Sequence, residues 1–435
     1  MLMTPFLNRR RTLQEMLAPG VLVLPTSLEV IRNGDAHFPY RPDSNFYYLT
    51  GFAEPEAVLV MVLGEQARSI LFCRSKDEER EIWDGFRYGP AGAQQSFGFD
   101  EAYAIDELEA RLPDFLANQP QVYFPLGQDA SWDARLTDAL SVVRQRARAG
   151  VKVPDIIVDI RTALSEMRLF KDGYELDIMR RAAAISAEAH RRAMQFASPG
   201  QYEYAVEAEM LHTFYRHGSR FPAYTSIVAG GANACVLHYI ENNQPLRDGD
   251  LLLIDAGCEL EGYASDITRT FPVNGRFSPA QKDVYEIVLA AQYAALEAVK
   301  PGANWMAPHE AVLKVLAQGL IDLKLCAGTV DGVIESESYR QFFMHRTGHW
   351  LGMDVHDVGN YKLDGEWRRL QPGMVLTIEP GLYIRPAANV PKHLENIGIR
   401  IEDDVVVTAE GHENLTAATP KTVAEIEAVM AEARG

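Results

Sequence analysis

The feature that most constrains this chain is a pair of aspartates set into apolar, strand-like sequence. Residues 251–272 read LLLIDAGCELEGYASDITRTFP, in which an almost continuous apolar run ends at Asp255 and Asp266 precedes a second strand-like segment. An apolar run of this kind is typical of a strand that is covered on both faces. Because unpaired carboxylates are almost never fully buried, the fold must neutralise both aspartates.

A hairpin that turns between Leu260 and Glu261 places Asp255 directly opposite Asp266. Directly opposed residues have Cβ atoms about 4.5–5.5 Å apart, and like charges at that separation are destabilising. One carboxylate could stay protonated, or a cation could neutralise both. A looser loop that leaves one aspartate in solvent is the third alternative, and this stretch alone leaves all three open.

Three histidines in one short segment favour the cation. The segment MHRTGHWLGMDVHDVG contains His345, His349 and His356, whereas the whole chain has only 11 histidines. Its glycines favour an irregular loop over a helix, and the HExxH motif of zinc peptidases is absent. A single histidine is more often structural than a ligand, but three within 12 residues indicate a functional site.

Two more carboxylates follow the same pattern as Asp255. Glu379 ends the apolar stretch LTIE, and Glu402 lies in the strand-like stretch IGIRIEDDVVVT. The segments DGDLLLIDAG and PGMVLTIEPG align at an offset of 124 (372 − 248), which matches Asp255 with Glu379. We therefore expect an internal repeat whose halves each supply carboxylates, although two short glycine-bounded strands can also match by coincidence.

The 435 residues are too many for one ordinary core, so we expect two or three domains. In the first part of the chain, strand-like segments at 20–25, 57–63, 69–74 and 121–127 alternate with helix-like segments. A long helical pattern follows at 173–197. We expect an α/β N-terminal domain over residues 1–169 and a second domain over residues 170–435.

Charge and cysteine usage restrict the partners. A net charge of −18 argues against nucleic acid and against anionic membrane surfaces. The longest apolar run, residues 57–63, is far shorter than the ~20 residues of a membrane span. Four scattered cysteines are typical of reduced thiols. We expect a cytoplasmic protein with no membrane or nucleic-acid partner.

The order and context of Asp255, Asp266, His349, Glu379 and Glu402 resemble those of the dinuclear-metal peptidases of the pita-bread fold. Within that family, four stretches look most like the Xaa-Pro aminopeptidases: TGHWLGMDVHDVG, IGIRIEDD, RPDSNFYYLTGF and EIWDGFRYGP. The resemblance covers nearly the whole chain. It implies an α/β N-terminal domain followed by an α+β pita-bread domain with a pseudo-two-fold internal repeat.

The resemblance also implies two divalent metal ions per chain. In similar enzymes the residues matching Asp266 and Glu402 bridge both ions, the residue matching Asp255 binds one ion, and those matching His349 and Glu379 bind the other. Four carboxylates and one imidazole are a hard ligand set that suits manganese(II) and accepts cobalt or zinc. A water between the ions would yield the hydroxide that attacks the carbonyl preceding proline.

Further roles follow from the same resemblance. Glu379 would accept the proton of the water, and His238 would stabilise the oxyanion. His345 or His356 would serve the proline nitrogen that leaves. Arg400 lies two residues before Glu402, on the same strand face, and would pair with a carboxylate or form a structural salt bridge. Thr268 would bond a metal ligand.

The expected substrates are peptides with proline at the second position. Candidates for the surface that recognises the proline ring are Tyr224, Val355, His356 and Tyr383. Trp83 is a more distant candidate, since the matching tryptophan of similar tetramers reaches a neighbouring active site; a core or interface role is the alternative. We expect a homo-oligomer, dimer or tetramer. A prolidase that cuts only Xaa-Pro dipeptides, and an inactive pita-bread binding protein, are the alternative functions.

Overall fold

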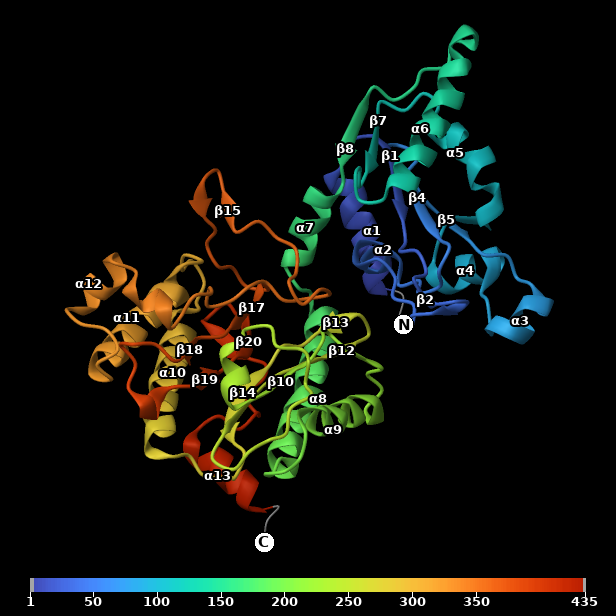
Figure 1. The fold of residues 1–435 in the computed structure, drawn as a ribbon. Coiled ribbons are helices and arrows are strands. Elements are labelled where there is room, and N and C mark those ends of the chain that lie inside the picture. Colours follow the sequence, from blue (N-terminus) through green and yellow to red (C-terminus); the bar gives the residue numbers. More distant parts are fainter. Residues whose placement is uncertain (1–3, 433–435) are drawn as a thin grey trace. The chain divides into compact units, whose positions relative to one another are not determined.

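The computed structural model describes residues 4–432, and the chain divides into two compact units between Ser165 and Glu166 (Figure 1). This division lies four residues before the boundary expected after Leu169, within helix α7 (Arg161–Leu169). Among the described residues, no helix is long and apolar enough to cross a membrane.

The N-terminal unit is built on one mixed six-stranded sheet in the order β6-β5-β4-β1-β7-β8. The bounds are β1 (Gly20–Pro25), β4 (Val58–Leu63), β5 (Arg68–Cys73), β6 (Glu101–Ala104), β7 (Gln121–Phe124) and β8 (Ile156–Asp159). The four expected strands are all present. β1 pairs antiparallel with β4 and parallel with β7, so both faces of this central strand are buried, as its continuous apolar sequence predicts.

The helices of this unit are α1 (Thr4–Met16), α2 (Ser44–Thr50), α3 (Glu78–Asp84), α4 (Gly89–Phe97), α5 (Leu108–Leu116) and α6 (Ala130–Gln145), and a small hairpin is formed by β2 (Ile31–Asn33) and β3 (Ala36–His37). Apolar side chains of α5 and α6 pack with those of β1, β4, β5 and β7 in one core cluster. The unit therefore has the α/β architecture expected from its sequence.

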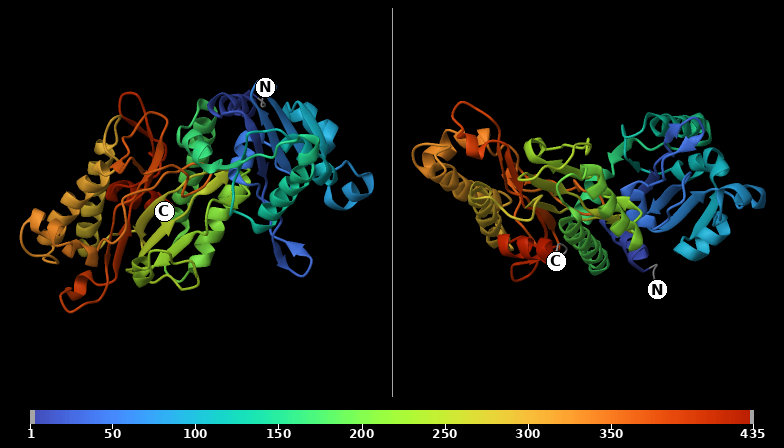
Figure 2. Two further views of the ribbon diagram at one scale, coloured as in Figure 1. Left: turned by 90° about the horizontal axis from the view of Figure 1, so that it is seen from above. Right: turned by 60° about the horizontal axis from the view of Figure 1, so that its bottom comes forward.

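The C-terminal unit contains two similar halves. Each half has two long helices and a three-stranded sheet, β10-β11-β14 in the first and β17-β20-β21 in the second. The first half comprises α8 (Gly173–Phe196), α9 (Glu203–Arg216), β10 (Ile227–Gly230), β11 (Leu251–Asp255) and β14 (Thr268–Pro272). The second comprises α10 (Pro279–Ala298), α11 (Ala307–Asp322), β17 (Val375–Ile378), β20 (Asp403–Val407) and β21 (His412–Asn414). The sheets lie between the two helix pairs (Figure 2).

Shorter elements complete the C-terminal unit: β9 (Phe221–Pro222), β12 (Cys258–Leu260), β13 (Tyr263–Ala264), α12 (Val330–Glu335), β15 (Lys362–Leu363), β16 (Glu366–Trp367), β18 (Gly381–Ile384), β19 (Ile397–Arg400) and α13 (Val423–Glu432). The helix starts are encoded locally. Asp172 and Glu175 form a capping box at the start of α8, and Ser278 and Gln281 form one at the start of α10.

Hydrogen bonds join the two halves where β14 meets the β19–β20 segment. The Glu402 backbone N–H donates to the Thr268 carbonyl at 3.0 Å, and the Thr270 hydroxyl donates to the Arg400 carbonyl at 3.1 Å. This seam brings residues about 130 positions apart in the sequence into one continuous structure. The candidate site lies along it.

Candidate metal centre

The hairpin that carries the two aspartates has a different register from the expected one. β12 and β13 pair with Leu260 opposite Tyr263, so the turn is formed by Glu261 and Gly262, with φ of 51° and 84°. Two-residue hairpin turns favour positive φ at both positions, which glycine supplies without strain. The expectation of a turn between Leu260 and Glu261 is therefore wrong by one residue.

The corrected register moves Asp266 away from direct opposition to Asp255. Asp255 lies opposite Thr268, and Asp266 precedes Thr268 by two residues, so the two aspartates are diagonal neighbours on one face. Gly257 permits this arrangement, because a Cβ at that position would lie 1.7 Å from the Ser265 carbonyl oxygen. The close approach of the two backbones thus requires glycine at this position.

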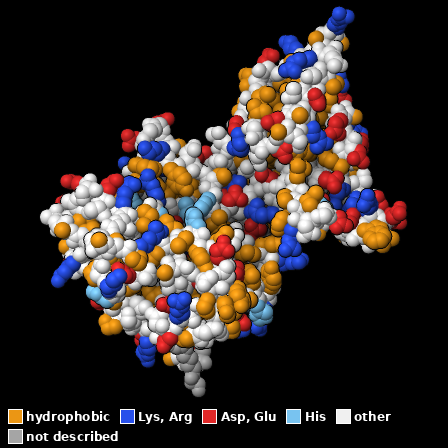
Figure 3. Space-filling model, viewed as in Figure 1, with side chains coloured by type: hydrophobic (Ala, Val, Ile, Leu, Met, Phe, Trp, Pro, Cys, Tyr) orange, Lys and Arg blue, Asp and Glu red, His pale blue; other side chains and the backbone are white. Residues whose placement is uncertain are grey.

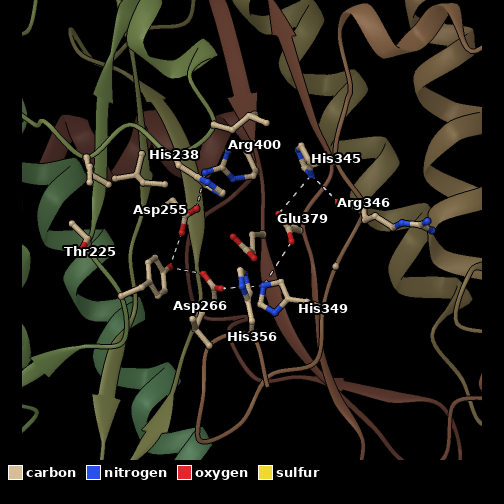
Figure 4. Close-up of a pocket in the computed structure, with 17 residues that line it drawn as sticks. Thr225, His238, Asp255, Asp266, His345, Arg346, His349, His356, Glu379 and Arg400 are labelled. Carbon is tan, nitrogen blue, oxygen red and sulfur yellow. Dashed lines mark hydrogen bonds and ion pairs between the residues drawn. The ribbon is translucent and has the colours of Figure 1, made fainter. Parts of the chain in front are cut away.

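Four carboxylates converge on one cavity of about 440 Å³ (Figure 4). Each lies at or beside the end of a strand: Asp255 ends β11, Asp266 precedes β14, Glu379 follows β17, and Glu402 precedes β20. His349 joins them from the irregular segment after residue 344, as its glycines predict. Two strand pairs from the two halves therefore supply the acidic groups, and the loop supplies the imidazole.

The Tyr224 hydroxyl lies between the two aspartates. It donates to Asp255 Oδ1 at 2.6 Å and also contacts Asp266 Oδ1. Burial and the two aspartate charges raise the pKa of Tyr224 well above its usual value, so this group stays a donor. Tyr224 is predicted from the sequence to recognise substrate, and in the structure its hydroxyl contacts the carboxylates.

Arg400 is the cation that contacts this acidic cluster. Its Nη2 lies 2.6 Å from Asp255 Oδ2, its Nη1 donates to the Tyr383 hydroxyl at 2.9 Å, and its Nε donates to Thr268 Oγ1 at 3.1 Å. Thr268 in turn donates to Glu402 Oε2 at 2.5 Å. Burial raises the pKa of Asp255, but the Arg400 charge and the hydrogen bonds from Tyr224 and Arg400 together outweigh burial, and the net pKa is lowered.

His349 presents one ring nitrogen to the carboxylates. Its Nδ1 lies 2.9 Å from the Trp350 carbonyl oxygen and therefore donates, which leaves Nε2 facing Asp266 at 3.5 Å and Glu379 at 3.8 Å. Burial lowers the pKa of His349, but the bond to Asp266 and the Glu379 charge outweigh burial and raise the pKa to about 9.

The remaining carboxylates repel one another. Burial and the Asp255 charge raise the pKa of Asp266, and burial with the charges of its acidic neighbours raises the pKa of Glu402 well above its usual range. Burial raises the pKa of Glu379 to about 7. A single arginine therefore does not balance the cluster, and the site is built to receive further positive charge.

Two other histidines border the same cavity with different surroundings. His345 Nδ1 lies 2.7 Å from the Arg346 carbonyl, and its Nε2 lies 2.8 Å from the Tyr383 hydroxyl. Burial and the Arg400 charge lower the pKa of His345 to about 3. His356 packs edge-on against His349 with ring centroids 4.4 Å apart. Burial, and to a smaller extent the charge of His349, lowers the pKa of His356.

The structure brings most of the expected residues together. The lining of the cavity includes Tyr224, His238, Asp255, Asp266, His345, His349, Val355, His356, Glu379, Arg400 and Glu402. Tyr383 is fully buried behind this lining and reaches the site through its hydroxyl. Trp83 lies on α3 of the N-terminal unit with 82% of its surface exposed. Histidine side chains reach the surface together on the C-terminal unit (Figure 3).

Several residues that contact the site were not predicted from the sequence. Asp404 Oδ2 accepts from the Asp266 backbone N–H at 3.0 Å, and His190 Nε2 lies 2.9 Å from the Ala256 carbonyl, beside Asp255. Asp357 pairs with Arg168 and Lys171 next to His356. The third acid of EDD was a possible signal for Asp404, but the partners of His190 and Asp357 are more than 60 residues away in the sequence.

The donor set fits hard divalent cations. Asp266, His349 and Glu402 each offer a ligand atom, and these atoms lie within 4.8 Å of one another. Asp255 and Glu379 extend the set on either side with further carboxylate oxygens. Oxygen donors with one imidazole suit manganese, magnesium or zinc, and no cysteine lines the cavity. The buried carboxylates with raised pKa values are the groups that bound cations would stabilise in their charged form.

The comparisons agree with this geometry. Residues 177–409 match the family model "Metallopeptidase family M24", and residues 6–123 match "Aminopeptidase P, N-terminal domain". The Xaa-Pro aminopeptidase of Escherichia coli (strain K12) is 47% identical over 99% of this chain and 98% of its own length. Human Xaa-Pro aminopeptidase 3 is 35% identical over 95% of this chain and 81% of its own length.

Solved structures extend the match to the fold. The aminopeptidase PepP of Pseudomonas aeruginosa superposes with a TM-score of 0.98 at 50% identity and covers 99% of this chain and 98% of its own. A zinc-substituted Escherichia coli aminopeptidase P in complex with product superposes with a TM-score of 0.97 at 46% identity, covering 99% of each chain. The expected α/β plus pita-bread architecture is thereby confirmed. The chain belongs to metallopeptidase family M24, carries the N-terminal domain of aminopeptidase P, and is a metal-dependent hydrolase.

Proposed function

We propose that this chain hydrolyses the bond between an N-terminal residue and a proline at the second position of a peptide. The observation that carries the proposal is the convergence of four carboxylates, His349 and Arg400 on one cavity of about 440 Å³. The similarity to proteins named Xaa-Pro aminopeptidase over nearly the full chain supports the substrate class and favours it over prolidase. The complete donor set argues against an inactive binding protein.

Two divalent cations, manganese(II) by preference, would be held by Asp255, Asp266, His349, Glu379 and Glu402. When bound, such ions supply a water of lowered pKa and polarise the scissile carbonyl. Asp266, His349 and Glu402 would form the core of this donor set, since one ligand atom of each lies within 4.8 Å of the others. Arg400 and Thr268 orient Asp255 and Glu402 through the hydrogen bonds described above.

Glu379 is the proposed proton acceptor. Burial raises its pKa to about 7 in the absence of bound cations, and cations bound nearby would favour the charged carboxylate that accepts a proton. Its side chain is 18% exposed, so it faces the cavity and remains accessible to a substrate. Its position at the end of β17 keeps its backbone fixed, since its N–H donates to the Thr347 carbonyl at 2.8 Å.

We assign a different role to each of His345, His356 and His238. Both nitrogens of His345 are occupied, by the Arg346 carbonyl and the Tyr383 hydroxyl, so we assign His345 to positioning. His356 then serves the proline nitrogen as it leaves, and His238 stabilises the oxyanion. Tyr224, Val355 and His356, with Ile227, Leu237 and Ile240, offer the apolar surface for the proline ring.

Two further parts of the proposal concern the whole protein. We propose a homo-oligomer, a dimer or tetramer, because Ile82, Trp83 and Phe86 are 81%, 82% and 67% exposed on one short segment of the N-terminal unit. In that assembly the N-terminal unit provides subunit contacts and narrows access to the site. We also propose a cytoplasmic location, which the four free cysteines support.

The test is hydrolysis of three matched peptides by protein reconstituted with manganese(II), with metal content measured on the same sample. We expect cleavage of Ala-Pro-Ala, slower cleavage of Ala-Pro, and none of Ala-Ala-Ala. Cleavage confined to Ala-Pro would favour a prolidase activity instead. If the metal-loaded protein cleaved none of the peptides, the proposal would be refuted. As a further check, Glu379→Ala should lose turnover more completely than His356→Ala; equal residual activity would remove Glu379 from the acceptor role.

A further inference from the structure

Two arginines line the cavity, and only one of them is paired with an acid. Arg400 is buried and bonded to Asp255, Thr268 and Tyr383. Arg346 is exposed, and among residues 4–432 no carboxylate forms an ion pair with it. Its contacts are with Met306 Sδ, 3.1 Å from Nη1, and with the Trp367 ring, whose centroid is 5.3 Å from Cζ. Its guanidinium is therefore available to an anion.

The position of Arg346 relative to the carboxylates suggests which anion. Arg346 directly follows His345, whose Nδ1 lies 3.8 Å from Glu379 Oε2. Its side chain lines the same cavity and extends away from the carboxylates (Figure 4). A peptide substrate has opposite charges at its two ends, and the carboxylates and their cations take the amino-terminal end. The carboxyl-terminal end of a short peptide would then point toward Arg346.

A short peptide has its terminal carboxylate close to the scissile bond. An extended chain rises about 3.3–3.6 Å per residue, so the carboxylate of a tripeptide lies roughly 7 Å beyond the scissile bond. A guanidinium can bind a carboxylate through two parallel N–H···O bonds. The guanidinium is positioned by Nη1, which donates to Met306 Sδ, and by the Trp367 ring, and its other N–H groups remain for an anion.

We propose that Arg346 binds the free C-terminal carboxylate of tripeptide-sized substrates and so makes this enzyme favour short peptides with a free acid terminus. This inference rests on the proposed Xaa-Pro activity and adds to it a determinant of peptide length. Arg346 is a specificity residue, since it is an exposed part of the cavity lining and forms no ion pair with the four carboxylates.

The experiment compares Ala-Pro-Ala with its C-terminal amide, Ala-Pro-Ala-NH₂, which has the same bonds and lacks the terminal charge. For the parent protein we expect kcat/KM to be about tenfold higher for the acid, as one exposed charge-assisted contact would give. In Arg346→Gln the ratio should fall to near one, and in Arg346→Lys it should be intermediate, because lysine keeps the charge without the planar fork. Raising the ionic strength should lower the parent ratio.

Lys362 offers a matched control. It lies over the same Trp367 ring, with Nζ 4.4 Å from the centroid, but it does not line the cavity. Lys362→Gln should keep the parent ratio. A parent ratio near one, or a ratio that Arg346→Gln leaves unchanged, would overturn the inference while leaving the Xaa-Pro activity intact. If neither peptide is cleaved, the proposed function itself fails.

Discussion

Asp357 allows the strongest quantitative prediction, because it sits in a buried ion cluster beside the site. Its Oδ1 lies 2.6 Å from Arg168 Nη2 and its Oδ2 lies 2.9 Å from Lys171 Nζ, and these three side chains are only 1–2% exposed. The Asp357 N–H also donates to the Trp350 carbonyl at 2.9 Å. These contacts hold the loop that carries His356 against the start of the C-terminal unit.

Replacing Asp357 by asparagine removes the carboxylate that pairs with buried Lys171 and one of the two carboxylates that pair with buried Arg168. Removing one member of a buried ion pair costs about 3–5 kcal/mol of unfolding free energy. Since 1 kcal/mol shifts the Tm of a domain of this size by about 2–4 °C, the Tm of the C-terminal unit should fall by roughly 6–20 °C. Differential scanning calorimetry on metal-depleted protein measures this.

The matched control is Asp354→Asn. Asp354 also pairs with Arg168, at 2.7 Å, but its side chain is 38% exposed, so the loss should stay below about 1 kcal/mol. A Tm for Asp357→Asn within about 2 °C of the parent would refute the argument that this cluster stabilises the unit. So would a loss for Asp354→Asn equal to that for Asp357→Asn, since burial would then not matter.

The same cluster predicts a pH dependence. Burial raises the pKa of Asp357, but Lys171 and Arg168 outweigh burial and lower it below its usual value. A carboxylate with a lowered pKa stabilises the fold above its unfolded pKa of about 3.9, and this contribution is lost as the pH falls through the folded pKa. The Tm difference between parent and Asp357→Asn should therefore be constant near neutral pH and shrink below about pH 4. A difference that grows on acidification would contradict the assignment.

Two further predictions concern the site itself. Manganese(II) at 100 times its Kd should stabilise the C-terminal unit by about 2.7 kcal/mol, which raises its Tm by roughly 5–11 °C. Asp266→Asn should lose most of this rise in Tm. An equal rise in both proteins would mean that the metal binds elsewhere. Tyr383→Phe removes the hydroxyl that contacts His345 and Arg400, so kcat/KM for Ala-Pro-Ala should fall about tenfold while the metal content stays unchanged. Kinetics equal to those of the parent protein would show that Tyr383 does not position His345 and Arg400.

Local patterns were sufficient to predict the elements that carry the site. The run LLLI before Asp255 is a buried strand, and the helical pattern at 173–197 corresponds to α8 (Gly173–Phe196). The glycines around His349 indicated an irregular segment, which the structure has. Such features depend on periodicity and on the residues at element ends, both of which are encoded within a few positions.

The register of the hairpin could not be predicted in the same way. Strands β11 and β14 are buried along nearly their full length, so burial alone does not distinguish two registers that differ by two residues. The turn at Glu261 and Gly262 and the contact of Gly257 with Ser265 select one register, and the second of these is a tertiary contact.

The sequence by itself determined that buried strands end in carboxylates, that such groups need cations, and that the order of the five ligands is that of a family of metallopeptidases. Only the tertiary structure decided how these groups meet: Asp255 diagonal to Asp266, Tyr224 between them, Arg400 on Asp255, and Asp357 with partners 186 and 189 residues away. The physical reason is the distance along the sequence over which each feature is encoded. Burial and periodicity are encoded locally, whereas the partner of a buried charge is chosen by the packing of distant segments.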